Sequence, residues 1–153
     1  MMVTSKEAEG LVKKGVAYAA RGKSREALAF FDRALSLDPD NPEAWHLRAA
    51  VFIGTGRNTE ALADSERAIT LNQNFAGAWS EKGQALYGLE RYEEAVSALT
   101  RALGLNGNDA TAWYIKGVCL EELGRTTEAE EAYARSLELE IILDIEKENR
   151  RSG

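Results

Sequence analysis

The sequence predicts an all-α fold built from pairs of helices, and three observations support this prediction. A pattern of large and small residues recurs every 34 residues, which is typical of stacked helical units. Within each unit, apolar residues follow the three- and four-residue spacing of one helix face. The 153 residues contain only two prolines, so long stretches can be helical.

The repeat consists of four adjoining blocks, residues 8–41, 42–75, 76–109 and 110–143. A large residue opens each block, a Gly or Ala follows one turn later, an Ala lies in the second half, and a Leu closes the block. Because Gly inside a helix costs up to about 1 kcal/mol relative to Ala, its recurrence indicates that another helix approaches closely there. The aligned positions are Leu11, Trp45, Trp79 and Trp113; Gly15, Ala49, Gly83 and Gly117; Ala27, Ala61, Ala95 and Ala129; and Leu37, Leu71, Leu105 and Leu139.

Each block is predicted to contain two helices with a short break between them. The breaks read "ARGKS", "GTGRN", "GLERY" and "ELGRT". Three of them contain a Gly that suits the left-handed end of a helix, namely Gly22, Gly56 and Gly124. The second helix of the same blocks is then expected to have its N-cap at Ser24, Asn58 and Thr126.

The aligned residues resemble the tetratricopeptide repeat, a 34-residue helix–turn–helix with a Trp–Gly–Tyr pattern followed by small–aromatic–small residues and Pro. The resemblance covers about residues 8–143. It implies an α-solenoid of four helix–turn–helix repeats in a right-handed superhelical array. It also implies that residues 1–153 form a single domain of this family, with a C-terminal helical extension at 144–150.

The sequence departs from the family pattern at two positions of the repeat. Ser65 stands where the other blocks carry Leu or an aromatic residue, and we expect a local packing deficit there. The family usually has Leu three residues after the Trp, whereas every block here has a basic residue. We expect these cations to form ion pairs and to cover the core with their apolar stems, rather than to form an anion track. They are Lys14, Arg48, Lys82 and Lys116.

The resemblance implies a function, because the first helices of such an array line a concave groove that binds a protein or peptide segment. Tyr87 and Tyr114 would offer large contacts at a low cost in entropy. The alternative is a solvated concave face without a dedicated ligand. The groove positions carried over from the family are Val12, Val16, Ala19, His46, Ala50, Ile53, Ser80, Gln84, Tyr87, Tyr114, Val118 and Glu121.

One specific activity of the family is not expected here. Some members hold the C-terminal carboxylates of chaperones in a clamp of two lysines, two asparagines and an arginine. None of the matching positions has the required side chain, and one of them has the opposite charge. These positions are Val12, Val16, Leu47, Gly77 and Glu81.

The C-terminal segment supports an alternative function. After Leu139 the chain reads "EIILDIEKENRRSG", so the last helix is expected to continue to about Asn149. No fifth repeat follows to cover its apolar residues. Either the extension covers the end of the fourth block, or the apolar face pairs with another chain. The second case predicts a self-associating structural scaffold, such as a homodimer, with an oligomer face at Ile141, Ile142 and Ile145.

Other classes of function find little support in the composition. The single His46 and the single Cys119 lie in different blocks without a supporting motif, so we expect no enzyme, no metal site and no cofactor. We interpret His46 as an exposed groove residue and Cys119 as a packed thiol. The net charge of −6 argues against nucleic acid. No run of about 18 apolar residues indicates a membrane span, and the lone Cys and the polar N-terminus favour a cytoplasmic location.

Overall fold

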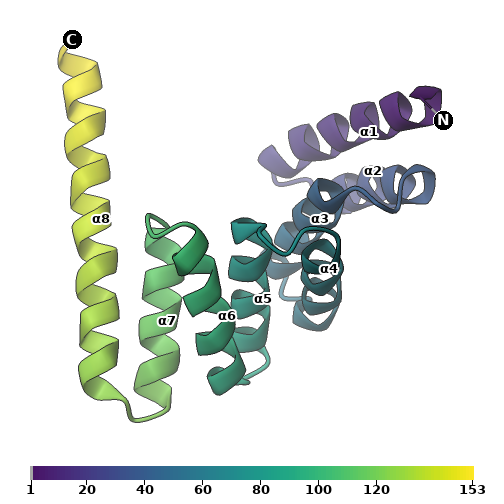
Figure 1. Ribbon diagram of the computed structural model, residues 1–153. Helices are drawn as coiled ribbons and strands as arrows, with labels where there is room; N and C mark the ends of the chain where they lie inside the picture. The colour runs from purple at the N-terminus through teal and green to yellow at the C-terminus, as the bar shows by residue number, and fades with distance from the viewer. Residues whose placement is uncertain (1) are drawn as a thin grey trace.

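The computed structural model describes residues 2–153, with side chains from Thr4 onward, and the described chain is an all-α solenoid. Consecutive helices form antiparallel pairs that stack side by side (Figure 1). The predicted fold class is therefore confirmed. The helices are α1 (Met2–Ala20), α2 (Ser24–Leu37), α3 (Pro42–Gly54), α4 (Asn58–Leu71), α5 (Ala76–Gly88), α6 (Tyr92–Leu105), α7 (Ala110–Glu122) and α8 (Thr126–Ser152).

The first helices of the pairs form the inner layer of this array. α1 contacts α3, α3 contacts α5, and α5 contacts α7. Within the described residues, by contrast, the second helices make no contact with one another. Because an array curves toward the layer whose members touch, the concave side is lined by α1, α3, α5 and α7. The α1–α2 pair stands at a wide angle to the rest, and α1 meets α3 at few positions (Figure 1).

Close approach within a pair explains the recurring Gly. A Cβ atom built on Gly117 would lie 2.7 Å from the ring of Tyr133, and one built on Gly15 would lie 2.5 Å from the ring of Phe31. The equivalent Gly of the third pair meets a Leu side chain in the same way. The two helices can therefore pack at this distance only because the first helix has no side chain at that point.

The second pair has a different combination of side-chain sizes at this point of contact. Ala49 replaces the Gly, Ser65 replaces the large residue, and both are completely buried. The Ser65 hydroxyl donates a hydrogen bond of 2.9 Å to the carbonyl oxygen of Leu62. Ala49 contributes a Cβ atom where the other pairs have none, and the smaller Ser65 stands at the partner position. This combination argues against the packing deficit expected at Ser65, which stays a prediction.

The breaks within the pairs confirm the predicted left-handed helix ends. Gly22, Gly56 and Gly124 have φ angles of 74°, 77° and 76°, and Glu90 occupies the same position of the third break at φ 60°. The following residue donates its backbone N–H to a carbonyl five residues earlier, which closes the end of the first helix.

The predicted N-caps are wrong by one residue. Ser24, Asn58 and Thr126 already have helical geometry, and the preceding basic residue is the N-cap, without a side-chain capping bond. Each break has three residues, of which the second is the left-handed residue and the third is the N-cap, so the next helix begins directly after them. In three breaks this Arg pairs instead with a Glu in the first turn: Arg57 with Glu60, Arg91 with Glu94, and Arg125 with Glu128.

The Trp side chains close the turns between repeats. Each indole N–H donates a hydrogen bond to a backbone carbonyl six residues earlier: Trp45 to Pro39 at 2.7 Å, Trp79 to Gln73 at 2.8 Å, and Trp113 to Gly107 at 2.9 Å. The basic residue three positions after the Trp lies over its ring, at 5.0 Å for Arg48, 5.4 Å for Lys82 and 5.3 Å for Lys116. A cation–π contact thus accounts for the basic residue where the family has Leu.

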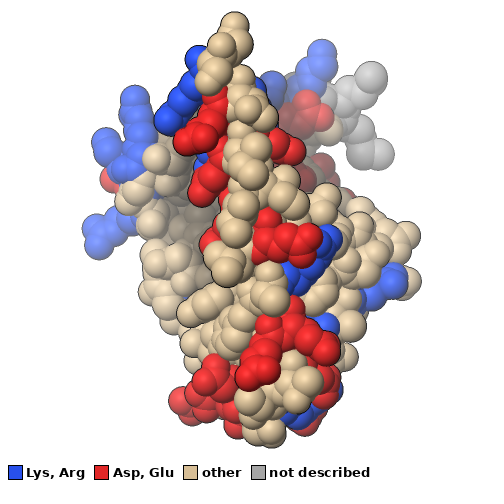
Figure 2. Space-filling view, turned by 90° about the vertical axis from the view of Figure 1, so that its left-hand side faces the viewer, with Lys and Arg blue, Asp and Glu red and all other residues tan. Residues whose placement is uncertain are grey.

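The last helix, α8, is much longer than the other second helices and projects away from the array (Figure 1). It reaches Ser152, beyond the extension predicted at 144–150, and residues 140–153 are all exposed. The extension therefore does not cover the end of the fourth repeat. Figure 2 faces α8 and shows an uncharged column along it, with carboxylates on either side.

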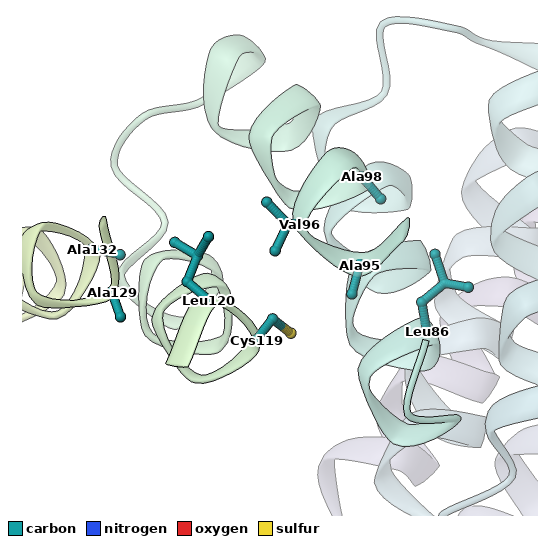
Figure 3. Close-up of a cluster of buried hydrophobic side chains, with 8 residues drawn as sticks. All are labelled: Leu86, Ala95, Val96, Ala98, Cys119, Leu120, Ala129 and Ala132. Atoms are coloured by element: carbon teal, nitrogen blue, oxygen red, sulfur yellow. The ribbon is translucent and has the colours of Figure 1, made fainter. Parts of the chain in front are cut away.

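The main buried cluster lies between the third and fourth pairs (Figure 3). It contains Leu86 of α5, three residues of α6, two of α7 and two of α8. A much smaller cluster of Phe52, Ala61 and Ala85 joins the second pair to α5, and Leu28 of the first pair packs against it. None of the described helices combines the length and the apolar character that crossing a membrane requires.

Candidate functional site

The N-terminal part of the predicted groove is an apolar hollow between the first and second pairs. It has a volume of about 400 Å³. Val16 and Ala19 of α1 lie on one side, Ala50 of α3 lies on the other, and Phe31 and Leu47 complete the lining. The wide angle between the first pair and α3 leaves this space open. The structure thus brings together three predicted groove residues in one concave and mainly apolar surface.

The middle of the groove contains a histidine–carboxylate pair. His46 Nδ1 on α3 lies 2.8 Å from Glu81 Oε2 on α5, and the imidazole packs against Phe75 at 4.7 Å between ring centroids. A Cβ atom on Gly77 would lie 2.7 Å from the imidazole. His46 is therefore not exposed as expected: its side chain is 22% exposed, and it bridges the second and third repeats. Its role in binding stays a prediction.

The charges of this pair depend on each other. Burial alone would lower the pKa of His46, but the hydrogen bond and the negative charge of Glu81 outweigh burial, so the pKa is raised above its usual 6.5. Burial in turn raises the pKa of the Glu81 carboxyl, although His46 opposes this shift. Glu81 occupies a position where a clamp for chaperone tails would need a cation, and its side chain is a buried carboxylate.

Ser80 and Gln84 belong to the junction between the third and fourth repeats. Ser80 is buried, and its hydroxyl donates to Asp109 Oδ2 at 3.2 Å. Gln84 Nε2 donates to the Ser80 oxygen at 3.3 Å. Asp109 also accepts a bond of 3.0 Å from the backbone N–H of Ala112 and so caps α7. Ser80, predicted to line the groove, therefore offers a ligand little surface.

The C-terminal part of the groove is aromatic and acidic. Tyr87 is 37% exposed and Tyr114 is 55% exposed. Tyr114 packs against Tyr133 at 5.6 Å between ring centroids, and the Tyr133 hydroxyl donates a bond of 2.6 Å to Glu121. Burial, followed by this hydrogen bond, raises the pKa of Tyr133. Val118 is half-buried beside this region, and Glu121 is exposed.

Arg48 forms ion pairs, as expected from the sequence, but their partners were not predicted. Its guanidinium donates to both carboxylate oxygens of the buried Asp64, at 2.7 and 2.9 Å, and to Asp32 at 2.9 Å. The hydrogen bond to Asp64 contributes most to raising the pKa of Arg48. Asp64 lies 16 residues after Arg48, the same separation that joins Gly15 to Phe31 across a pair, whereas Asp32 belongs to the preceding pair. This spacing was the available signal.

The candidate reactive residues lie apart from each other. Cys119 is buried in the cluster of Figure 3, whereas His46 lies between α3 and α5. Burial raises the pKa of the Cys119 thiol to about 11, so the thiol is protonated at neutral pH. Among the side chains that the structure describes, no group of three or more His, Cys, Asp or Glu residues is placed to hold a metal ion.

Comparisons with known proteins agree with this architecture. A family model described as tetratricopeptide repeat matches residues 80–140. A second model, described as anaphase-promoting complex, cyclosome, subunit 3, matches residues 20–102. No curated protein sequence matches the chain.

Several solved structures share the fold. MamA, residues 41 to the end, from Desulfovibrio magneticus RS-1 is 26% identical, with a TM-score of 0.79 over 90% of this chain and 77% of that chain. The thermophilic TPR protein TTC0263 of Thermus thermophilus is 26% identical, with a TM-score of 0.76 over 87% and 74% of the two chains. The first TPR of Spaghetti (RPAP3), bound to the HSP90 peptide SRMEEVD, is 29% identical, with a TM-score of 0.76 over 78% and 95%.

Proposed function

The chain belongs to the tetratricopeptide repeat family, and from this premise we propose that it binds a peptide or protein segment in its concave groove. Arrays of this fold act generally as protein–protein interaction modules. The observation that carries the proposal is the combination of an apolar hollow of about 400 Å³ with exposed tyrosines on the same layer of helices. A partner segment would place an aliphatic side chain in the hollow.

The mechanism of binding would be pre-organisation. Arg48 on α3 is bonded to Asp32 on α2 and to Asp64 on α4. The His46–Glu81 pair joins α3 to α5. Ser80 and Asp109 join the third repeat to the fourth. Because these bonds hold the inner helices in place before a ligand arrives, less conformational entropy is lost on binding.

The C-terminal part of the groove favours a partner with hydrogen-bonding or basic side chains. Tyr87 and Tyr114 present aromatic faces that suit a cation or a planar group, and Glu121 adds a negative charge. The repeat array solved with an HSP90 peptide supports a short linear ligand in general. For this chain a different ligand is proposed, because Glu81 is unsuited to hold a terminal carboxylate.

Selection of binders from a displayed random peptide library, followed by fluorescence polarisation on the selected peptides, tests this proposal. We expect saturable binding that falls at least tenfold in the Tyr87→Ala, Tyr114→Ala double variant. Ala50→Arg, which fills the hollow, is expected to have a similar effect. Ser97→Arg on the exposed surface of α6 is the matched control and should bind as the wild type does. Equal affinity in all variants would refute groove binding.

A second candidate function is a self-associating structural scaffold, as a homodimer or a larger assembly. The observation that favours it is the uncovered apolar surface of α8, which includes Ile141, Ile142 and Ile145. We further infer a cytoplasmic location, no catalytic activity, no cofactor, and neither a nucleic-acid nor a membrane partner. All of these stay predictions.

A further inference from the structure

The outer surface of α8 carries the same kind of apolar residues that α6 uses to pack against the first helix of the next repeat. In the third repeat, Leu103 of α6 is only 8% exposed, because it packs with Leu99 against Ala112 of the following helix, α7. Leu137 of α8 is the equivalent residue 34 positions later, and it is 58% exposed. Ile141 and Ile145 continue the same stripe at four-residue spacing and are 52% and 54% exposed.

The outer surface of α1 is the complementary half of such a junction. Gly10 of α1 is exposed, and a Cβ atom built on it would meet nothing within 4 Å. Its equivalents in the later repeats, Ala44, Ala78 and Ala112, are at most 1% exposed, because the preceding second helix covers them. Ala17 lies about two turns after Gly10 on the same face of α1 and is also exposed. Its equivalents, Ala85 in α5 and Cys119 in α7, are completely buried.

The lengths of the two terminal helices match. α8 continues for 13 residues beyond Leu139, the counterpart of the last residue of α6. α1 begins six residues before Ala8, the counterpart of the first residue of α3. In every junction of this array the second helix runs antiparallel to the first helix that follows it. The two extensions would therefore lie side by side, and the N-terminal turns of α1 would cover Ile141 and Ile145.

The prevailing charges on the two surfaces are of opposite sign. The exposed Lys6 and Lys13 lie on the same face of α1 as Gly10, together with one carboxylate, Glu7. Carboxylates border the uncharged column of α8, and some Lys or Arg side chains also lie beside it (Figure 2). Glu138 and Asp144 are exposed and follow or precede Leu137 and Ile145 directly in the sequence. An antiparallel pairing of two α8 helices is less favourable, because the register that sets Leu137 against Ile145 also sets Glu138 against Asp144, and like charges repel.

We propose that α8 of one copy docks on α1 of a second copy as an additional repeat junction, so that copies assemble head to tail. This inference rests on the second candidate function, self-association, and supplies the occupant of the α8 surface. Because the two contacting surfaces differ, the contact does not close on itself in a pair, and assembly can continue to longer chains as concentration rises.

Two variants with one altered end each test the proposal by sedimentation velocity. The tail variant carries Leu137→Glu and Ile141→Glu, and the head variant carries Gly10→Arg and Ala17→Arg; all four positions are exposed, so folding should persist, as circular dichroism will check. We expect wild-type mass to rise with concentration and each variant alone to be monomeric. An equimolar mixture should form a one-to-one complex, because each variant retains the end that the other lacks.

Other outcomes overturn the proposal in distinguishable ways. If the head variant alone still dimerises while the tail variant does not, α8 pairs with α8, and self-association stands without the head-to-tail contact. If the wild type is monomeric at every concentration, both fail. As a second readout, a mixture of Gly10→Cys and Leu137→Cys chains should form an interchain disulfide on mild oxidation, which neither chain forms alone. Peptide binding in the tail variant should be unchanged, since the groove is untouched.

Discussion

At the scale of single residues, the four breaks within the helix pairs show how one backbone conformation is obtained with different side chains. Gly22, Gly56 and Gly124 adopt it without steric cost, whereas Glu90 adopts φ 60° with a Cβ atom present. For an L-residue other than Gly, this left-handed conformation costs about 1–2 kcal/mol. The third break is therefore the strained one among the four.

We predict that Glu90→Gly raises the free energy of unfolding by about 1 kcal/mol, since Gly relieves the strain but loses more backbone entropy on folding. Urea denaturation monitored by circular dichroism measures the change. Gly56→Glu is the matched control, because it introduces the same strain in the second break, and it should destabilise the protein by a similar amount. A loss of stability in Glu90→Gly would contradict this account.

A second prediction at this scale concerns His46, the only histidine of the chain. The neighbouring Glu81 raises the folded-state pKa of His46 above 6.5. The folded protein then binds this proton more tightly than the unfolded chain does. The stabilisation is fully present below pH 6.5 and is lost as the pH rises through the folded pKa.

Thermal unfolding between about pH 6 and about pH 9 should therefore show a falling melting temperature. Cys119 has a pKa of about 11 in the folded protein and an ordinary value near 9 when unfolded, so it adds a further fall only at the upper end of this window. His46→Gln should flatten the curve, since it removes the titrating group. A slope that persists in His46→Gln would assign the pH dependence to another group.

At the scale of elements, a pair of helices is held by a complementary choice of sizes at one point of contact. Gly83 faces Leu99 in α5–α6, whereas Ala49 and Ser65 occupy the equivalent positions in α3–α4. Either combination lets the helices approach. A large residue opposite a Cβ atom would not, because packed interiors have little room to adjust.

We therefore predict that Ser65→Leu alone destabilises the protein, because the Leu would meet the Cβ atom of Ala49. Ala49→Gly alone should cost about 1 kcal/mol in helix propensity, and more where a cavity forms. The double variant restores the Gly–Leu pair of α5–α6, so a double-mutant cycle should give a favourable coupling of about 1–3 kcal/mol. A higher melting temperature for Ser65→Leu alone would instead support a packing deficit.

At the scale of the whole molecule, each repeat contacts only its neighbours, so the stability of the array depends on the packing at each junction between adjacent repeats. The largest buried cluster lies between the third and fourth pairs. The first pair is set at a wide angle beside the apolar hollow, and the ion pair of Arg48 with Asp32 crosses that junction. The uncovered α1 and α8 surfaces are the two remaining halves of a junction.

Much of this architecture could be predicted from the sequence, and the site could be predicted only in part. The recurring Gly and the breaks at Gly22 and Gly56 depend on local geometry, which a few neighbouring residues determine. The pairing of His46 with Glu81 joins residues 35 positions apart. It depends on how two helices are rotated against each other, which the 34-residue pattern does not specify. The burial of Ser80 against Asp109 could not be predicted for the same reason.

The sequence by itself determined the helices, their order and their pairing, because helix periodicity and backbone preferences act within one repeat. Only the tertiary structure decided which predicted groove residues stay accessible: Tyr87 and Tyr114 do, whereas Ser80 and His46 are used in the junctions. It also decided that α8 projects freely instead of covering its own repeat. These outcomes depend on the angles between repeats, and side chains distant in sequence set those angles by their packing.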